Sequence, residues 1–143
     1  TNSLNYGFNL FKKYQNYKYL SLDEKEWSLG LNIPNVKIKD VSNYAKKNKK
    51  KIFAFTMGKS GSAIFSNNRT NFSESLIDKV VDTTGCGDAY FAFSTVLLNA
   101  KIKIENISFL SNIYAGLYGQ FFGNSSTISG VKISKFVQSV LKF

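Results

Sequence analysis

The sequence predicts an α/β fold in which helices cover a central sheet. Short apolar runs typical of strands alternate with longer segments in which apolar residues recur at helical spacing. The chain has 143 residues, of which 43% are hydrophobic, so it can bury the core of one domain. Because strands that alternate with helices are typical of parallel pairing, we expect a mostly parallel sheet flanked by helices.

The expected strands are short runs between turn signals, at 17–22, 52–57, 62–66 and 70–72. The expected helices carry apolar residues on one face, at 6–14, from 23 onward, and at 41–50, 87–99, 106–122 and 132–141. The acids at 23–26 suit a helix start, where the helix dipole favours negative charge. The segments 58–61 and 67–69 are expected turns because of their Gly and Asn residues.

One cysteine and no histidine exclude several kinds of site. A disulfide within the chain is impossible, a zinc site built from Cys and His has no ligands, and Ser-His-Asp or Cys-His catalysis is excluded for this chain. No run approaches the roughly 18 apolar residues that span a bilayer, and no signal-peptide pattern opens the sequence. We therefore expect a cytoplasmic protein with no membrane partner.

The formal net charge is +10, from 19 Lys and Arg against 9 Asp and Glu. A basic surface can bind nucleic acid. Here nearly all basic residues are lysines spread among Asn, Ile, Phe and Tyr, without a helix-turn-helix, RNP-type or zinc pattern. We expect no nucleic-acid partner, and we interpret the densest run, at 46–51, as the solvated end of a helix.

The segment from 80 to 89 carries the clearest chemical signal. Gly85 and Gly87 flank one small residue, Cys86, and a helix is expected directly afterwards. A glycine-rich turn at a helix start presents several free backbone N–H groups in one direction, and the helix dipole adds positive potential there. This turn is therefore a candidate cradle for phosphoryl oxygens, and Asp88 at its rim is a candidate base for an attacking hydroxyl.

The run Asp82-Thr83-Thr84-Gly85-Cys86-Gly87-Asp88 resembles the second signature of the ribokinase-like (PfkB) carbohydrate kinase family, Asp-Thr-x-Gly-x-Gly-Asp. The resemblance implies a ribokinase-like layered fold and ATP-dependent phosphorylation of a sugar or sugar-phosphate hydroxyl, with Mg²⁺ bridging the phosphates. It implies Asp88 as the base and the amides of Gly85, Cys86 and Gly87 as an anion hole. Family members are much longer and the match covers their C-terminal half. We therefore expect residues 1–143, which begin without Met, to be the C-terminal part of a single kinase domain.

The segment 56–61 contains a Gly-Lys-Ser triplet, but a Walker A interpretation fails. That pattern needs a glycine where Phe53 stands and a helix after the triplet, whereas 62–65 alternates like a strand. The Thr-x-Gly-x-x-Gly form instead resembles the nucleotide-contacting turn of ribokinase-like enzymes, whose glycines let the backbone approach ATP closely. The residues that would contact ATP are Thr56, Gly58, Lys59, Ser60 and Gly61.

Two acids after the first strand resemble a third family feature, an Asn-x-x-Glu that organises water around the magnesium–phosphate group. Glu26 matches the Glu, and Asp23 replaces the Asn, which keeps an oxygen acceptor but loses a donor. The resemblance implies an outer-shell metal role for these two residues. The alternative is that both only favour a helix start.

Three further residues fall at family positions. Asn112 lies where the family places a residue beside the adenine; the alternative is a polar residue on a helix surface. Asp82 and Thr84 match positions whose oxygens hold a monovalent cation in some relatives, which adds K⁺ as a candidate cofactor. The loop that would complete such a site, at 123–127, does not clearly match.

The sequence indicates the sugar that would accept the phosphoryl group less clearly than it indicates the nucleotide. The stretches 2–10 and 22–26 are similar to a subgroup related to heptose-phosphate kinases, which favours a sugar phosphate, and the resemblance allows a homodimeric parent. Two alternatives stay open: a truncated or degenerate, non-catalytic, kinase-like nucleotide-binding fragment, and a basic nucleic-acid-binding module. The intact Asp88 and the two glycines beside it favour the kinase.

Overall fold

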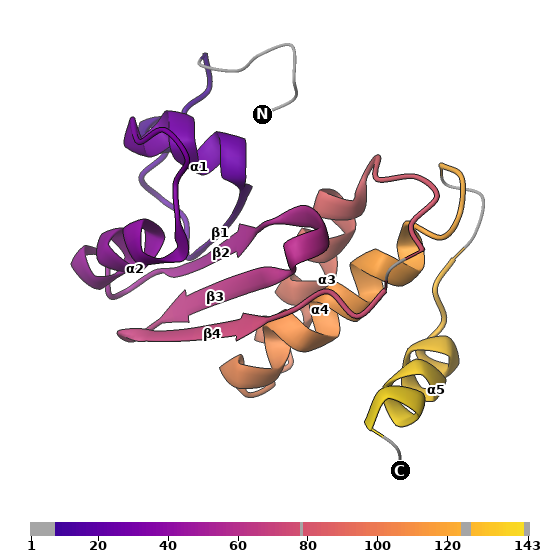
Figure 1. Ribbon diagram of the computed structural model, residues 1–143. Helices are drawn as coiled ribbons and strands as arrows, with labels where there is room; N and C mark the ends of the chain where they lie inside the picture. Colours follow the sequence, from indigo (N-terminus) through magenta and orange to yellow (C-terminus); the bar gives the residue numbers. More distant parts are fainter. Residues whose placement is uncertain (1–7, 78, 124–126, 142–143) are drawn as a thin grey trace.

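The computed structural model describes residues 8–77, 79–123 and 127–141. The central feature is a sheet of four strands in the order β1-β2-β3-β4 (Figure 1). The strands are β1 (Tyr19–Asp23), β2 (Ile52–Thr56), β3 (Ser62–Ser66) and β4 (Arg69–Ser73). The α/β class expected from the sequence is therefore confirmed.

The sheet is mixed rather than mostly parallel within the described residues. β1 and β2 pair in parallel, with Leu20 opposite Phe53, whereas β2–β3 and β3–β4 are antiparallel. The connections explain this difference: two helices separate β1 from β2, while only short turns join β2 to β3 and β3 to β4. In the second of these turns Asn67 and Asn68 take positive φ values of 49° and 65°, which suits a two-residue hairpin loop.

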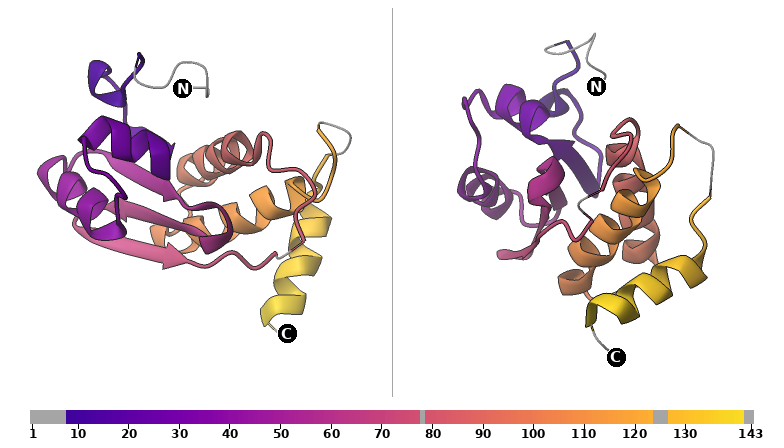
Figure 2. Two further views of the ribbon diagram at one scale, coloured as in Figure 1. Left: turned by 45° about the horizontal axis from the view of Figure 1, so that its top comes forward. Right: turned by 45° about the vertical axis from the view of Figure 1, so that its right-hand side comes forward.

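Helices cover both faces of the sheet (Figure 2). The helices α1 (Glu24–Leu31) and α2 (Ile38–Lys47) lie on one face, and α3 (Cys86–Asn99) and α4 (Ile104–Tyr118) lie on the other. The last helix, α5 (Gly130–Leu141), packs against α4. The chain therefore forms three layers, as the alternation of its elements predicts.

Two apolar cores hold the sheet to the helices on its faces, and a third cluster, around Ile113, packs α5 against α4. On the α1–α2 side, Trp27 and Val41 are buried against Phe53, and the Trp27 indole donates a hydrogen bond of 3.0 Å to the Ala54 carbonyl. On the α3–α4 side, Ile64 of β3 packs with residues of both helices. Alternate residues of the central strands thus enter opposite cores, as the pleat of a strand requires.

Several element boundaries differ from the expected ones, and α2 spans Ile38–Lys47 rather than 41–50. Within the expected helix at 6–14, the described part contains only a 3₁₀ turn, η2 (Phe11–Lys13). Helix α4 ends at Tyr118 rather than at 122, because Gly119 caps it and the chain turns back toward the residues before α3.

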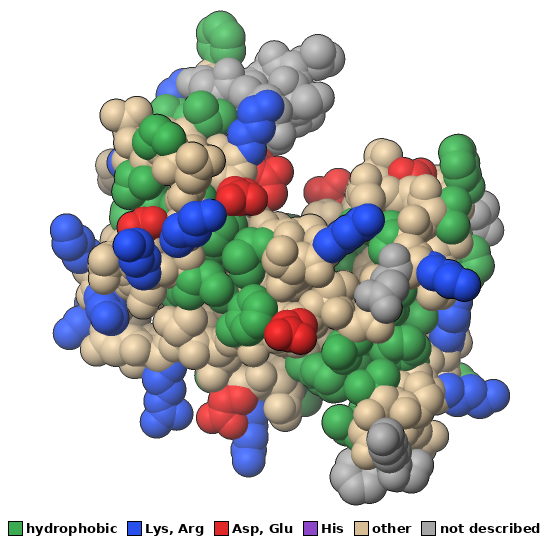
Figure 3. Space-filling view, viewed as in Figure 1, with side chains coloured by type: hydrophobic (Ala, Val, Ile, Leu, Met, Phe, Trp, Pro, Cys, Tyr) green, Lys and Arg blue, Asp and Glu red, His purple; other side chains and the backbone are tan. Residues whose placement is uncertain are grey.

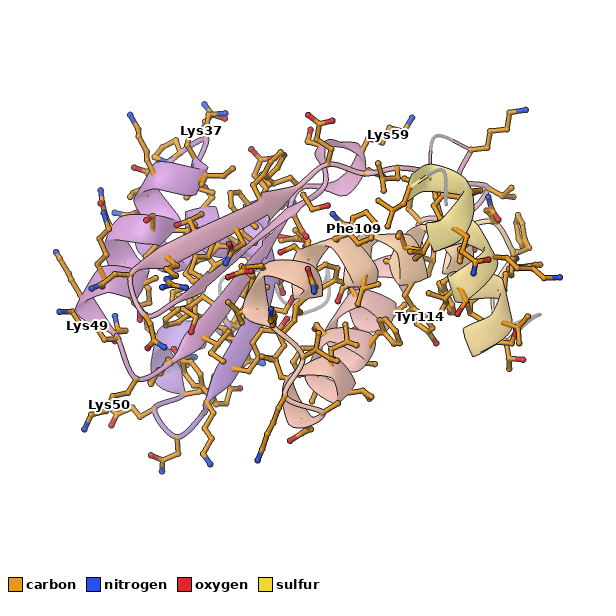
Figure 4. The ribbon with its side chains drawn as sticks, turned by 90° about the horizontal axis from the view of Figure 1, so that it is seen from below. Lys37, Lys49, Lys50, Lys59, Phe109 and Tyr114 are labelled. Atoms are coloured by element: carbon orange, nitrogen blue, oxygen red, sulfur yellow. The ribbon has the colours of Figure 1, made fainter. Side chains whose placement is uncertain are left out.

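The surface lysines do not gather around one site. Lys49 and Lys50 follow α2 and lie at the opposite end of β2 from Lys59 (Figure 4). This placement agrees with the interpretation of the lysine run as a solvated helix end. Among the described residues, no helix combines the length and the apolar character needed to cross a membrane.

Candidate active site

The phosphate-binding candidate is the turn that leads into α3. Gly85 is the N-cap of this helix and takes φ 79° and ψ −2°, a left-handed conformation that favours glycine. A Cβ at Gly85 would also lie 3.2 Å from the hydroxyl of Tyr118, so a side chain there would crowd α4. Asp88 stands exposed in the first turn of the helix. The sequence motif therefore forms a helix start with its acid at the rim.

The backbone amides of this turn are not equivalent. The Cys86 amide donates to the Thr83 carbonyl at 3.2 Å, and the Ala89 amide donates to the Gly85 carbonyl at 2.8 Å. Within the described part of the chain, the amides of Gly85, Gly87 and Asp88 have no acceptor. The helix start can therefore offer Gly85, Gly87 and Asp88 amides to an anion, while the Cys86 amide closes the turn itself.

The side chain of Asp82 holds the loop before the helix. One carboxylate oxygen accepts from the Thr84 amide at 2.8 Å, and the other accepts from the Gly123 amide at 3.1 Å. Hydrogen bonds from Thr84 and then from the Gly123 amide lower the pKa of Asp82. Both carboxylate oxygens are thus used by backbone amides. The rest of the predicted K⁺ loop, at 124–126, lies outside the described residues.

The nucleotide-contacting turn and the phosphate-binding turn meet in one cleft of about 270 Å³. The first turn is η3 (Gly58–Ser60), which follows β2. Gly58, Lys59 and Gly61 line one side of this cleft, and Cys86 and Gly87 line another. Two segments more than twenty residues apart in sequence are therefore brought together as predicted, although Ser60 is not among the lining residues.

Asn112 lies on α4 at the edge of the same cleft and is 9% exposed. Its side-chain amide donates to the Ser73 carbonyl at 2.8 Å and to the Glu74 carbonyl at 3.3 Å. Asn112 thus fixes the chain where it leaves β4. The surface-helix alternative is wrong, because this residue is buried and hydrogen-bonded across two elements.

A second cleft, of about 510 Å³, opens on the other side of Gly87. Three residues line both clefts: Asp23, Thr56 and Gly87. The second cleft also contains Asp88 and Glu26, so three carboxylates line it, without a lysine or arginine among its described lining residues. Figure 3 shows acidic side chains on both sides of a notch at the top of the molecule. After the roles that we propose below, we call this the acceptor cleft and the first one the nucleotide cleft.

Asp23 and Glu26 form a capping box at the start of α1. The Asp23 carboxylate accepts from the Glu26 amide at 2.7 Å, and the Glu26 carboxylate accepts from the Asp23 amide at 3.0 Å. The helix-start role that the sequence left open is therefore present. Within the described ranges, no group of three or more Asp, Glu, Cys or His residues is placed to hold a metal ion directly. Both residues nevertheless line the acceptor cleft.

Several lining residues carry no motif and were missed by sequence reasoning. The nucleotide cleft is completed by Ser75, Ile77, Val80, Tyr90, Ala115 and Gly116. Gly116 and Gly119 follow each other at one helical turn near the end of α4, and this spacing is the one signal in the sequence that could have identified α4 as a close neighbour of another segment.

The family model of the pfkB family carbohydrate kinases matches residues 12–125. This match includes both turns and the cleft between them. The chain belongs to the PfkB carbohydrate kinase family. No curated protein sequence matches the chain significantly.

Solved structures of PfkB-like kinases share the fold of this chain. Ribokinase of Arabidopsis thaliana, complexed with ribose and ATP, is 25% identical with a TM-score of 0.74, over 85% of this chain and 41% of the other. Phosphofructokinase-2 of Escherichia coli, in complex with potassium, is 17% identical with a TM-score of 0.74, over 90% and 42%. Ribokinase of Thermotoga maritima is 20% identical with a TM-score of 0.72, over 85% and 42%. The chain therefore spans about two fifths of these structures. The heptose-kinase subgroup is not confirmed by these matches, and residues 2–7 of the two stretches that indicated it lie outside the described residues.

Proposed function

We propose that this chain is the nucleotide-binding, base-carrying C-terminal part of a single carbohydrate kinase domain, which transfers a phosphoryl group from ATP to a hydroxyl of a sugar or sugar phosphate. The observation that carries the proposal is the position of Gly87 and Asp88. Gly87 lines both clefts, and Asp88 lines the acceptor cleft beside it. A phosphate held at the helix start would thus face a hydroxyl held next to a carboxylate.

The chemistry follows from this geometry. Phosphoryl transfer needs in-line positioning and neutralisation of charge on the equatorial oxygens. The amides of Gly85, Gly87 and Asp88 can stabilise that charge, and the Cys86 amide can join them only by leaving the Thr83 carbonyl. The Asp88 carboxylate would accept the proton of the attacking hydroxyl.

ATP and Mg²⁺ are the cofactors that this proposal requires. A magnesium ion bound to the phosphates neutralises part of their charge. Asp23 and Glu26 line the acceptor cleft, and one carboxylate oxygen of each already accepts a backbone amide in the capping box. We therefore assign them outer-shell contacts through water rather than direct ligation. Thr56, Gly58, Lys59 and Gly61 would contact the nucleotide, together with Asn112.

Potassium is a second candidate cation. The similar phosphofructokinase-2 of Escherichia coli forms a complex with potassium. In this chain the Asp82 carboxylate is occupied by two backbone amides. Each carboxylate oxygen keeps a lone pair beside its one amide donor, so main-chain or side-chain oxygens of Asp82 and Thr84 would be the ligands.

The carboxylates of the acceptor cleft limit what can bind there. Asp23, Glu26 and Asp88 would repel a phosphate group placed beside the reacting hydroxyl. If the acceptor is a sugar phosphate, its phosphate must lie away from these residues. A non-catalytic nucleotide-binding protein is the second candidate, because two of the three hydroxyls among the described lining residues of the acceptor cleft are already hydrogen-bonded within the fold. Tyr19 bonds to Ser94 and Thr56 to the Leu22 carbonyl, which leaves few side-chain donors for a sugar.

Nucleotide binding and turnover test the two parts of the proposal separately. Calorimetric titration of the chain with MgATP should show weak, saturable binding; an absence of binding would overturn the nucleotide site. A coupled ADP-release assay with a panel of sugars and sugar phosphates should give no sugar-stimulated turnover for residues 1–143 alone. Sugar-stimulated, Asp88-dependent turnover by the chain alone would support the kinase and overturn the assignment to part of a domain. If a longer protein that contains the chain binds ATP but phosphorylates no sugar, the non-catalytic candidate is correct.

A further inference from the structure

The end of α4 lies directly against the phosphate-binding turn, more than thirty residues away in sequence. The Gly119 carbonyl accepts hydrogen bonds from the Val81 amide at 2.7 Å and from the Asp82 amide at 3.0 Å. Gly119 therefore holds the segment that leads into the turn. These contacts are made by the backbone, so they do not yet explain why residue 119 is a glycine.

The glycine is explained by space rather than by backbone conformation. Gly119 has φ −67° and ψ −5°, which any residue adopts. A Cβ at this position would lie 2.7 Å from Cγ1 of Val80, 2.9 Å from the thiol sulfur of Cys86 and 3.0 Å from the Asp82 carbonyl oxygen. The first two distances are shorter than Cβ contacts in proteins, so a side chain at 119 would displace the Val80 and Cys86 side chains and crowd the Asp82 carbonyl.

Cys86 links this contact to the anion-binding amides. It is the first residue of α3, and its half-buried thiol donates weakly to the Asp82 carbonyl at 3.5 Å. Burial raises the pKa of this thiol, so it stays neutral in its place against Gly119. Gly85 and Gly87 are its neighbours in the chain. Any displacement of Cys86 therefore moves both of their amides.

We propose that Gly119 is a positioning residue of the phosphate-binding turn, and that Gly119 and Cys86 form a size-matched pair that sets the direction of the Gly85 and Gly87 amides. The larger side chain at 86 fits because residue 119 has none. The inference rests on the proposed function, since it assigns those amides to a nucleotide phosphate.

The test is a double-mutant cycle on the full 143-residue chain with two readouts. The first is the ¹⁵N–¹H shifts of the Gly85 and Gly87 amides without nucleotide, and the second is the affinity for MgATP. Gly119→Ala should shift both amides and weaken ATP binding by about tenfold or more, because small displacements at a phosphate site cost large factors. Adding Cys86→Ala removes the sulfur contact and should restore a substantial part of both losses. The loss that remains is due to the contact between the new Cβ and Val80.

Gly30→Ala is the matched control for stability. Gly30 lies in α1, and a Cβ there would collide with the Phe11 ring, far from the turn. This variant should lower the melting temperature yet leave the Gly85 and Gly87 shifts and the ATP affinity unchanged. A loss of ATP affinity in Gly30→Ala equal to that in Gly119→Ala would show a general stability effect and overturn the positioning role.

The remaining outcomes separate this inference from the proposed function. If the wild-type chain does not bind ATP, the nucleotide site is wrong, while the amide shifts still decide the positioning role. Unchanged shifts in Gly119→Ala, or a failure of Cys86→Ala to restore any of the loss, overturn the inference. Should Gly119→Ala fail to fold, Cys86→Val enlarges the same contact from the other side and leaves α4 unaltered. Unchanged ¹⁵N–¹H shifts of the Gly85 and Gly87 amides in Cys86→Val would also overturn the inference.

Discussion

The two clefts that meet at Gly87 are built in different ways. The nucleotide cleft, of about 270 Å³, is lined by turns and helices from four parts of the chain, and glycines supply many of its walls. The acceptor cleft, of about 510 Å³, lies along β1, which has a strand partner on one side only within the described sheet. Its described walls combine carboxylates, apolar side chains and the hydroxyls of Tyr19, Ser21 and Thr56.

This difference teaches where specificity resides in this part of the fold. Backbone amides can bind the phosphates of any nucleoside triphosphate. The described residues already supply such amides and glycines to the nucleotide cleft. In the proposed function, the acceptor cleft would place the Asp88 carboxylate beside the phosphate, but two of its three lining hydroxyls already bond within the fold. We therefore expect changes in the nucleotide cleft to alter ATP binding and changes in the acceptor cleft to alter turnover alone.

The largest expected effect is that of Asp88→Asn on turnover. In a kinase that carries this chain, the substitution should lower kcat by about 10²–10⁴-fold, because Asn keeps the shape and removes the proton acceptor. The dissociation constant for MgATP should change by less than about twofold, since Asp88 does not line the nucleotide cleft. A coupled ADP-release assay and a calorimetric titration measure the two values. Near-normal turnover would exclude Asp88 as the base.

Gly61→Ala should produce the next largest effect, on ATP binding. Gly61 has φ 96° and ψ −145°, a region open almost only to glycine, and a Cβ there would strike the Ser73 carbonyl. We expect a loss of roughly 3 kcal/mol or more in the free energy of unfolding and no measurable ATP binding. Gly58→Ala is the matched control, because a Cβ at Gly58 meets nothing within 4 Å. Its φ of 54° should cost only about 1 kcal/mol. Equal losses in the two variants would contradict the steric argument.

Asn112→Ala should have an intermediate effect on both stability and ATP binding. It removes the side-chain amide that donates to the Ser73 and Glu74 carbonyls, at a cost of about 1–3 kcal/mol, and leaves the Glu74 carbonyl with the Ser73 hydroxyl as a donor at 3.2 Å. Because these carbonyls lie where the chain leaves β4 toward the nucleotide cleft, ATP affinity should fall as well. Asn99→Ala removes a similar amide from the exposed end of α3, where it donates to Thr95. Asn99→Ala should change neither the free energy of unfolding nor the ATP affinity appreciably. A loss comparable to that in Asn112→Ala would contradict the role of Asn112 in fixing the end of β4.

The smallest expected effect is the pH dependence caused by Asp82. Its pKa is lower in the folded state than the unfolded value of about 3.9, so its stabilisation is complete above that value and is lost as the pH falls through the folded pKa. The melting temperature of Asp82→Asn should therefore lie below that of the wild type at neutral pH, and the gap should close in acid. Glu105→Gln, which removes an exposed 3.8 Å ion pair with Arg69, should show almost no gap at any pH. A gap for Asp82→Asn that widens in acid would contradict this assignment.

Local chemistry was readable from the sequence because it depends on residues close together in the chain. The glycine-rich helix start, the acid at position 88 and the strand at 62–66 follow from local pattern and appear in the structure as expected. The expectation of a mostly parallel sheet was wrong for β3 and β4, because the short turns before these strands require antiparallel pairing. Alternation of strands with helices favours parallel pairing only where a helix connects two strands, and no α-helix connects β2 to β3 or β3 to β4.

By itself, the sequence determined the residue types at the phosphate turn and the family to which the turn belongs. Only the tertiary structure decided which amides are free, that Asp23 and Glu26 cap a helix, and that Asn112 clamps the end of β4. The same holds for Gly119, whose missing side chain matters only because Val80 and Cys86 lie against it. The physical reason is that hydrogen bonds and steric contacts between distant segments depend on distances in space, which the spacing of residues along a chain does not contain.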